Sequence, residues 1–401
     1  MAGEPHAHRL KGFAAMGVAG AQIALIFALS TLPTPLYGDY RKLFGYDDIT
    51  ASLLFGVYAV GTMGSLFFFG RLSDQIGRRL VSLPAIAVAA VTALIFATSL
   101  TLPALFVARA LSGLAVGLSA GAAMAWLPEL DPAGNSARAA TVAVAFKIAG
   151  QGSGAFLTGF LAEWGRFKFS LPFLAYVGLL LPLTAAVAFT QETVADCKPF
   201  AKISLRPEIG VPRDKWLVFV PAGLANFVMM SLVGFYSAIT PTLLEKTLKI
   251  ESHAAIGVVV AAMFALATLT TCFTTRLDPK RAMLGGAAMM LPMLALLEIS
   301  QALASLPALL AATACGGVAL GLGYRGSMEI ANRLAPRERR AELMSAYLLC
   351  GNLGTVLPVL GVGFVSEIGG RDLAHAYFCN RHRGPIVGRV RLGAGRRHTL
   401  D

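Results

Sequence analysis

The sequence predicts an all-α polytopic membrane protein, and three observations lead to this fold class. Of the 401 residues, 56% are hydrophobic and only 14% are charged, whereas about a quarter of the residues in a soluble domain are charged. Long uncharged runs reach the roughly 20 helical residues that cross a bilayer core. These runs are continuously apolar and lack the alternation of a barrel strand, so the spanning elements are helices.

The apolar runs predict about eleven spans. Seven runs are free of charge: 13–37, 49–70, 80–101, 169–190, 216–244, 252–275 and 343–366. Four more contain or end at a charged residue: 103–128, 139–162, 282–300 and 305–329. The first run is too long for the apolar region of a signal peptide and has no clear cleavage site after it, so we expect it to be retained as the first span.

The formal net charge of +12 does not indicate a nucleic-acid partner, because the basic residues lie between the apolar runs and not along one face. The five cysteines are scattered without the spacing of a metal site or a disulfide framework. The sequence contains no GxxxxGK[ST] loop and no HExxH pattern. We therefore expect no cofactor, no metal, no ATP-driven transport and no enzymatic activity.

The distribution of Lys and Arg predicts the orientation, because cytoplasmic connections retain the excess of these residues. Alternate connections starting with the N-terminus are rich in them: 9–11, 71–79, 138, 198–215, 276–281 and 333–340. The other connections hold few: Arg41, Lys42, Arg166, Lys168, Lys246, Lys249 and Arg371. The N-terminus is therefore predicted in the cytoplasm, with the chain in the inner (plasma) membrane.

An internal repeat divides the chain into two related helix bundles. Residues 70–79 follow the second span, and the shorter, degenerate stretch 275–281 follows the eighth. Glycine-rich stretches likewise recur in the fifth and eleventh spans, at 150–154 and 351–354. We expect a six-helix bundle over 1–190, a cytoplasmic linker over 191–214 and a bundle with five recognisable spans over 215–370.

At this point the chain resembles the major facilitator superfamily. Residues 70–79 match that family's loop between the second and third helices, of the form G-x-L-[AGS]-D-x-x-G-R-[RK], at every fixed position. The resemblance covers roughly residues 13–370. It implies a monomeric secondary transporter with twelve helices in two pseudo-symmetric bundles and a central cavity that alternates access, driven by a solute or ion gradient.

The C-terminus departs from the family pattern. Residues 371–401 carry seven arginines and no apolar run long enough for a span. We therefore expect the twelfth helix to be missing or altered, with 371–401 an Arg-rich tail from a frameshift or other alteration.

The 70–79 loop supplies the predicted gating residues. Asp74 can accept hydrogen bonds from neighbouring arginines, and Gly70 and Gly77 allow close backbone approach. Together with Arg78 and Arg79, such a cluster can latch two bundles in one state and release them in another. The alternative is ordinary positive charge on the cytoplasmic side with turn glycines.

Charged residues inside the spans supply candidates for proton coupling or substrate binding, since such residues are costly unless they face the bundle interior. Arg109 lies in the fourth span, where the family often keeps an arginine associated with proton coupling. Lys147 lies two turns into the fifth span, with Gln151 one turn further on the same face. Each charge can instead form a structural ion pair, and Arg109 can also extend towards the surface.

Arg325 and Glu329 lie one helical turn apart and are predicted to pair near the inner end of the tenth span, as a gate or a structural pair. The alternative is that Arg325 contacts the solute. Glu163 lies near an outer helix end and is expected to be solvated. Asp39 also lies near the outer surface and is expected to be an ordinary interfacial residue, with proton exchange as the alternative.

The predicted function is secondary active transport of a small organic solute by alternating access, with protons as the coupling ion. Gly150 and Gly154 resemble the glycine-rich fifth-helix motif of antiporters in the family, without its usual proline, which favours proton-coupled efflux like that of drug:proton antiporters. Organic-anion uptake is an alternative, because the charges within the spans are cationic. A nonfunctional truncated remnant is another, because the last helix is not recognisable.

Overall fold

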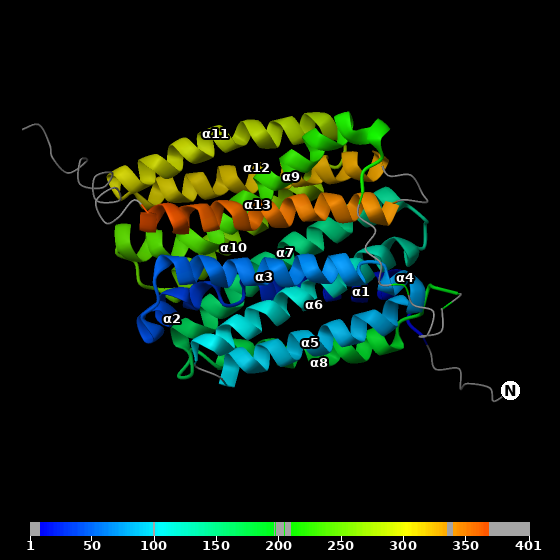
Figure 1. Ribbon diagram of the computed structural model, residues 1–401, viewed down its shortest axis with the longest axis horizontal. Helices are drawn as coiled ribbons and strands as arrows, with labels where there is room; N and C mark the ends of the chain where they lie inside the picture. Colours follow the sequence, from blue (N-terminus) through cyan, green and yellow to red (C-terminus); the bar gives the residue numbers. More distant parts are fainter. Residues whose placement is uncertain are drawn as a thin grey trace, which may run out of the picture.

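The computed structural model describes residues 9–98, 101–195, 197, 204, 210–334 and 340–368. These residues form a bundle of long helices that run roughly along its longest axis (Figure 1). Ten of the described helices are long and apolar enough to cross a membrane. The predicted all-α membrane fold is confirmed. The predicted Arg-rich tail, 371–401, lies outside the described residues, as does much of the predicted linker.

The first half of the chain contains six long helices and two short ones. In chain order they are α1 Gly12–Thr31, α2 Tyr37–Phe44, α3 Asp48–Phe69, α4 Leu72–Ile76, α5 Arg78–Thr98, α6 Leu102–Glu129, α7 Ser136–Trp164 and α8 Leu171–Phe189. The predicted first span ends earlier than expected, because Pro33 and Pro35 interrupt it and a 3₁₀ turn, η1 Thr34–Leu36, leads into α2.

The described residues of the second half form five long helices: α9 Trp216–Thr242, α10 His253–Phe273, α11 Pro279–Leu303, α12 Leu306–Leu334 and α13 Arg340–Ile368. Short turns lie beside α9, at η3 Arg213–Lys215 and η4 Leu243–Thr247. Polar side chains cap several helices, as when Ser252 accepts from the amide of Ala255 at the start of α10 and Asp278 accepts from the amides of Lys280 and Arg281 in α11.

Helix α7 is a predicted span that is not among the ten most apolar helices. Its middle carries Lys147, Gln151 and several glycines, which lower its hydropathy. The helix packs against α1 on one side and α10 on the other. Neighbouring helices therefore shield this polar segment from lipid.

The two halves pack their helices in the same way, as the internal repeat predicts. Helix α1 packs on α7 as α9 packs on α13, and α3 packs on α6 as α10 packs on α12. The closest approaches are also repeated. A Cβ at Gly154 of α7 would lie 2.1 Å from the Ala28 carbonyl oxygen of α1, and one at Gly354 of α13 would lie 2.1 Å from the Phe227 carbonyl oxygen of α9. Glycine is required at both crossings, because only it lets the backbones meet.

Each half has its own apolar core. One buried cluster is built almost entirely from α1–α8, and a second from α9–α13 with three residues of α7, namely Val144, Ile148 and Ala155. The halves meet mainly through two helix pairs, α7 with α10 and α3 with α13. A hinge-like movement between the halves would therefore change these two pairs, together with the part of the second core that α7 supplies.

The bundle has two chemically different ends. At the end where α1 begins, called the basic end, lie Arg71, Arg78, Arg79, Arg138 and Arg333 (α4 marks this end in Figure 1). At the opposite end lie α2 and the start of α10 (Figure 1). Large apolar side chains are exposed along helices between the two ends, for example Val60, Val91 and Leu291, as expected of a surface that faces lipid.

Candidate functional site

A small central cavity of about 70 Å³ lies between the two halves. Helices α1, α3, α6 and α7 of the first half and α9 and α13 of the second contribute to its wall. The polar and charged lining residues are Ser30, Thr31, Tyr58, Thr62, Arg109, Lys147, Gln151, Asn226, Ser237, Asn352 and Thr355. The described lining contains two cationic side chains and no acidic one.

Lys147 lies in the cavity wall with 5% of the residue exposed. Its ammonium donates a hydrogen bond to the Tyr324 hydroxyl of α12 at 2.5 Å. The same nitrogen lies 4.0 Å from the centre of the Tyr324 ring and 5.4 Å from that of Phe27. Because α12 belongs to the second half, this contact joins the halves at the cavity.

Gln151 lies one turn after Lys147 on α7 and also lines the cavity, so the structure brings these two predicted residues together. Its backbone carbonyl accepts a hydrogen bond from the Thr31 hydroxyl of α1 at 2.5 Å. Helix α7 is thus tied to α1 next to the crossing at Gly154, and the Lys147 face is held towards the second half.

Arg109 also lines the cavity, and only 1% of it is exposed. Its Nη1 donates to the Ser30 carbonyl of α1 at 3.1 Å and its Nε to the Leu54 carbonyl of α3 at 3.4 Å. The guanidinium carbon lies 4.7 Å from the Tyr58 ring centre. Carbonyl oxygens and an aromatic face therefore stabilise this buried cation, and the side chain points inward instead of extending to the surface.

Tyr324 is the cavity partner that the sequence analysis missed. It lies directly before Arg325 in a stretch rich in glycine, and it is fully buried. The sequence offered one signal for this residue, a bulky phenol in a span of small residues. Its partner could not be read from the sequence, because Lys147 is 177 residues away.

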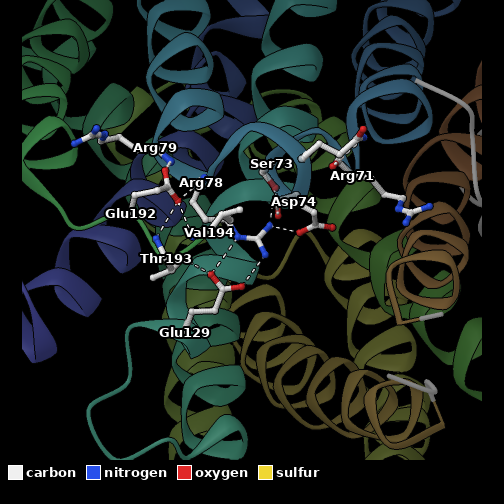
Figure 2. Close-up of polar contacts among 11 residues, drawn as sticks. Arg71, Ser73, Asp74, Arg78, Arg79, Glu129, Glu192, Thr193 and Val194 are labelled. Carbon is white, nitrogen blue, oxygen red and sulfur yellow. Dashed lines mark hydrogen bonds and ion pairs between the residues drawn. The ribbon is translucent and has the colours of Figure 1, made fainter. Parts of the chain in front are cut away.

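The predicted gating loop is centred on Arg78 at the basic end (Figure 2). Its guanidinium donates to the Glu129 carboxylate at 2.7 and 3.2 Å, to the Ser73 hydroxyl at 2.8 Å and to Asp74. Such paired, charge-assisted contacts fix a guanidinium firmly. Glu129 ends α6, so the loop is tied to that helix.

A second carboxylate holds the backbone of the same loop. The amides of Arg78 and Arg79 both donate to Glu192 at 2.9 Å, at the start of α5 (Figure 2). Gly77 allows this approach, because its φ is +110° and a Cβ there would lie 2.7 Å from the Glu192 carboxylate. Neither Glu129 nor Glu192 was predicted from the sequence.

Gly70 lies where the loop approaches the second half: a Cβ on it would lie 3.7 Å from the Ser345 hydroxyl of α13. The hydrogen bonds described above for Arg78 and Arg79 all stay within residues 70–193. The loop is thus built as a rigid corner of the first half that faces α13. Its role as a latch between the halves remains a prediction.

Arg325 and Glu329 pair as the helical spacing indicates, with 3.1 Å between Nη1 and Oε2. Arg325 also donates to the Leu277 carbonyl at 2.9 Å, and Arg333 donates to Glu329 at 2.6 Å. With Arg138 of α7 they line a second cavity, of about 580 Å³, at the basic end between the halves. The pair therefore lines this second cavity and not the Lys147 cavity.

Comparison with known proteins agrees with this architecture. Residues 18–357 match the family model described as Major Facilitator Superfamily. The fold is similar to the crystal structure of a bacterial homologue of the human lysosomal transporter Spinster, in an inward-facing and unoccupied conformation. That similarity has a TM-score of 0.65 at 15% sequence identity and covers 94% of this chain and 87% of that chain. The chain therefore belongs to the Major Facilitator Superfamily of membrane transporters.

Proposed function

We propose that the protein is a secondary active transporter that moves a small organic anion across the inner membrane by alternating access. The observation that supports this most directly is the charge of the central cavity. Lys147 and Arg109 line it, and the described lining carries no carboxylate. Of the two solute classes that the sequence predicts, an anion fits this wall better than a cationic drug.

Electrostatics gives the physical reason. A buried cation loses its hydration, and without a compensating charge this loss is expensive. Arg109 donates hydrogen bonds to two backbone carbonyl oxygens. The Lys147 ammonium, by contrast, has three N–H donors and a single described hydrogen-bond acceptor, the Tyr324 hydroxyl. A carboxylate or phosphate group in the cavity would supply both the missing acceptors and the missing charge.

The size of the cavity supports alternating access. A buried water needs roughly 10–15 Å³ of cavity volume, so about 70 Å³ has room for a few waters and too little for an organic solute larger than a few heavy atoms. The solute must therefore enter in a more open conformation. The α7–α10 and α3–α13 pairs are the contacts that a movement between the halves would change.

Proton-coupled efflux is the second candidate, and Lys147 again supports it. A lysine in a protein interior can exchange a proton, which an arginine does not. Because Lys147 contacts Tyr324 of the other half, a change in its charge would alter a contact between the halves. In this case solute and proton would compete for the same face of α7.

The test is flux in proteoliposomes with panels of organic anions and organic cations, under an imposed pH gradient. We expect wild-type anion flux, its loss in Lys147→Gln, and partial recovery in Lys147→Arg. Lys280→Gln, an exposed lysine at the start of α11, is the matched control and should transport normally. If the wild type instead transports cations, and Lys147→Gln changes only the pH dependence of that flux, the result would support proton-coupled efflux. Unchanged flux would reject a role for Lys147.

A further inference from the structure

Four charged or titratable side chains meet at the opposite end of the bundle, and we call them the Asp39 cluster. The His253 Nε2 lies 2.6 Å from one carboxylate oxygen of Asp39, and the Lys168 ammonium lies 3.0 Å from the other. The His253 Nδ1 lies 3.8 Å from Glu163. Asp39, Glu163 and Lys168 belong to the first half, whereas His253 begins α10 of the second. The cluster therefore joins the two halves.

The centre of the cluster, at Asp39 and His253, is sheltered, whereas Glu163 is exposed as the sequence predicts. The Asp39 side chain is 14% exposed and the His253 side chain 20%. Glu163 also accepts a hydrogen bond from the Ala254 amide at 3.2 Å, so it binds the N-terminus of α10. Partly buried charges are screened less by salt than surface charges, so the protonation of His253 matters to this contact.

The geometry favours the protonated imidazole. A neutral imidazole has one donor nitrogen and would turn the lone pair of the other towards a carboxylate, whereas imidazolium donates from both. The facing groups are Asp39 of α2, Glu163 of α7 and Lys168 of the α7–α8 connection, with Glu251 exposed two residues earlier. With imidazolium, the cluster of two carboxylates and two cations is neutral. With neutral imidazole, one negative charge remains uncompensated.

The backbones of the two halves also pack tightly beside the same histidine. A Cβ at Gly159 of α7 would lie 2.6 Å from the His253 carbonyl oxygen, and one at Gly257 of α10 would lie 2.7 Å from the Ala155 carbonyl oxygen. At the basic end, by contrast, the cavity of about 580 Å³ lies between α7 and α12. The halves are therefore closed at the cluster, whereas α7 and α12 enclose an open space at the other end.

We propose that His253 is a proton-binding latch: its protonated ring holds α10 against α2 and α7, and loss of the proton releases this end of the bundle. His253 acts on the relative position of the halves and does not touch the solute. The proposal rests on the proposed function in one respect: in a transporter with alternating access, the released state would be the conformation open at this end. The latch itself can be measured without any solute.

The experiment is a distance measurement between spin labels on the full chain in lipid nanodiscs, from pH 5 to pH 9. Labels at Phe167→Cys and Leu303→Cys, in a background without other cysteines, report on the opposite end, since both side chains are exposed there in different halves. We expect a short distance at low pH and a growing population of longer distances at high pH, as the imidazolium loses its proton.

Two substitutions and one control decide the outcome. His253→Gln should abolish the pH dependence, and His253→Arg should hold the short distance at every pH. Lys42→Gln removes another ion pair between the halves, at 4.0 Å from Glu245, and should leave the pH dependence in place. A wild-type distance that does not change with pH, or a pH dependence that persists in His253→Gln, would overturn the latch. If the proteoliposomes show no flux but the distance between the labels still depends on pH, the transport proposal is overturned and the latch is not.

Discussion

At the scale of single residues, Arg109 shows how a charge becomes tolerable inside the bundle. Its guanidinium reaches carbonyl oxygens of two different helices, at Ser30 and Leu54, over the Tyr58 ring. A lysine has one nitrogen and cannot span both carbonyls. Hydrogen bonds to charged groups contribute about 1.5–3 kcal/mol each, so the arrangement contributes to the packing of α1, α3 and α6 as well as to the charge of the cavity.

We expect Arg109→Lys to lower the free energy of unfolding by about 1–3 kcal/mol, with an intact charge and weaker anion flux. Thermal unfolding in detergent, followed by circular dichroism, measures the first effect. Arg333→Lys is the matched control, because the Arg333 side chain is 67% exposed, and surface changes usually stay within about 0.5 kcal/mol. Equal unfolding temperatures for the two variants would contradict the structural role of Arg109.

At the scale of the helix, small residues determine how closely the spans pack. The glycine at 154 meets a backbone carbonyl of α1, and backbone cannot move aside as a flexible side chain can. Gly178 in α8 is different, because a Cβ there meets nothing within 4 Å. The two positions look alike in the sequence, as single glycines in apolar helices, and only the packing separates them.

The substitution Gly154→Ala should therefore push α7 away from α1 and lower the free energy of unfolding by about 1–3 kcal/mol. Gly178→Ala should raise it by about 0.5–1 kcal/mol, because alanine favours the helix. Unfolding curves of the two variants, recorded side by side, measure the difference. A destabilised Gly178→Ala together with a neutral Gly154→Ala would show that the α1–α7 crossing is not tight.

The elements also show what the sequence can and cannot predict. The spans were predictable, because lipid demands a long uncharged run and this property is local. Helix α2 was not, because its apolar lead-in merges with the first span and only Pro33 and Pro35 separate them. The placement of Lys147 and Gln151 on one face followed from the helical period. Glu129, Glu192, Tyr324 and His253 did not follow, since their partners lie far away in the chain.

At the scale of the whole molecule, the two ends of the bundle differ in charge and in packing. The central cavity lies between a basic end with a polar space of about 580 Å³ and an opposite end closed by the Asp39 cluster. The excess of Lys and Arg in connections at the basic end predicts that this end faces the cytoplasm. The orientation then decides which compartment sets the protonation of His253.

This orientation is testable with an impermeant maleimide on whole cells. In a background without other cysteines, Phe167→Cys at the opposite end should react in intact cells, and Ala133→Cys in the exposed connection between α6 and α7 should react only after permeabilisation. The reversed pattern would contradict the prediction. If the predicted pattern holds, external acid would hold the outer end shut through His253 while the basic end stays open to the cytoplasm. A falling external pH should then slow the return of the empty transporter to the outward-open state.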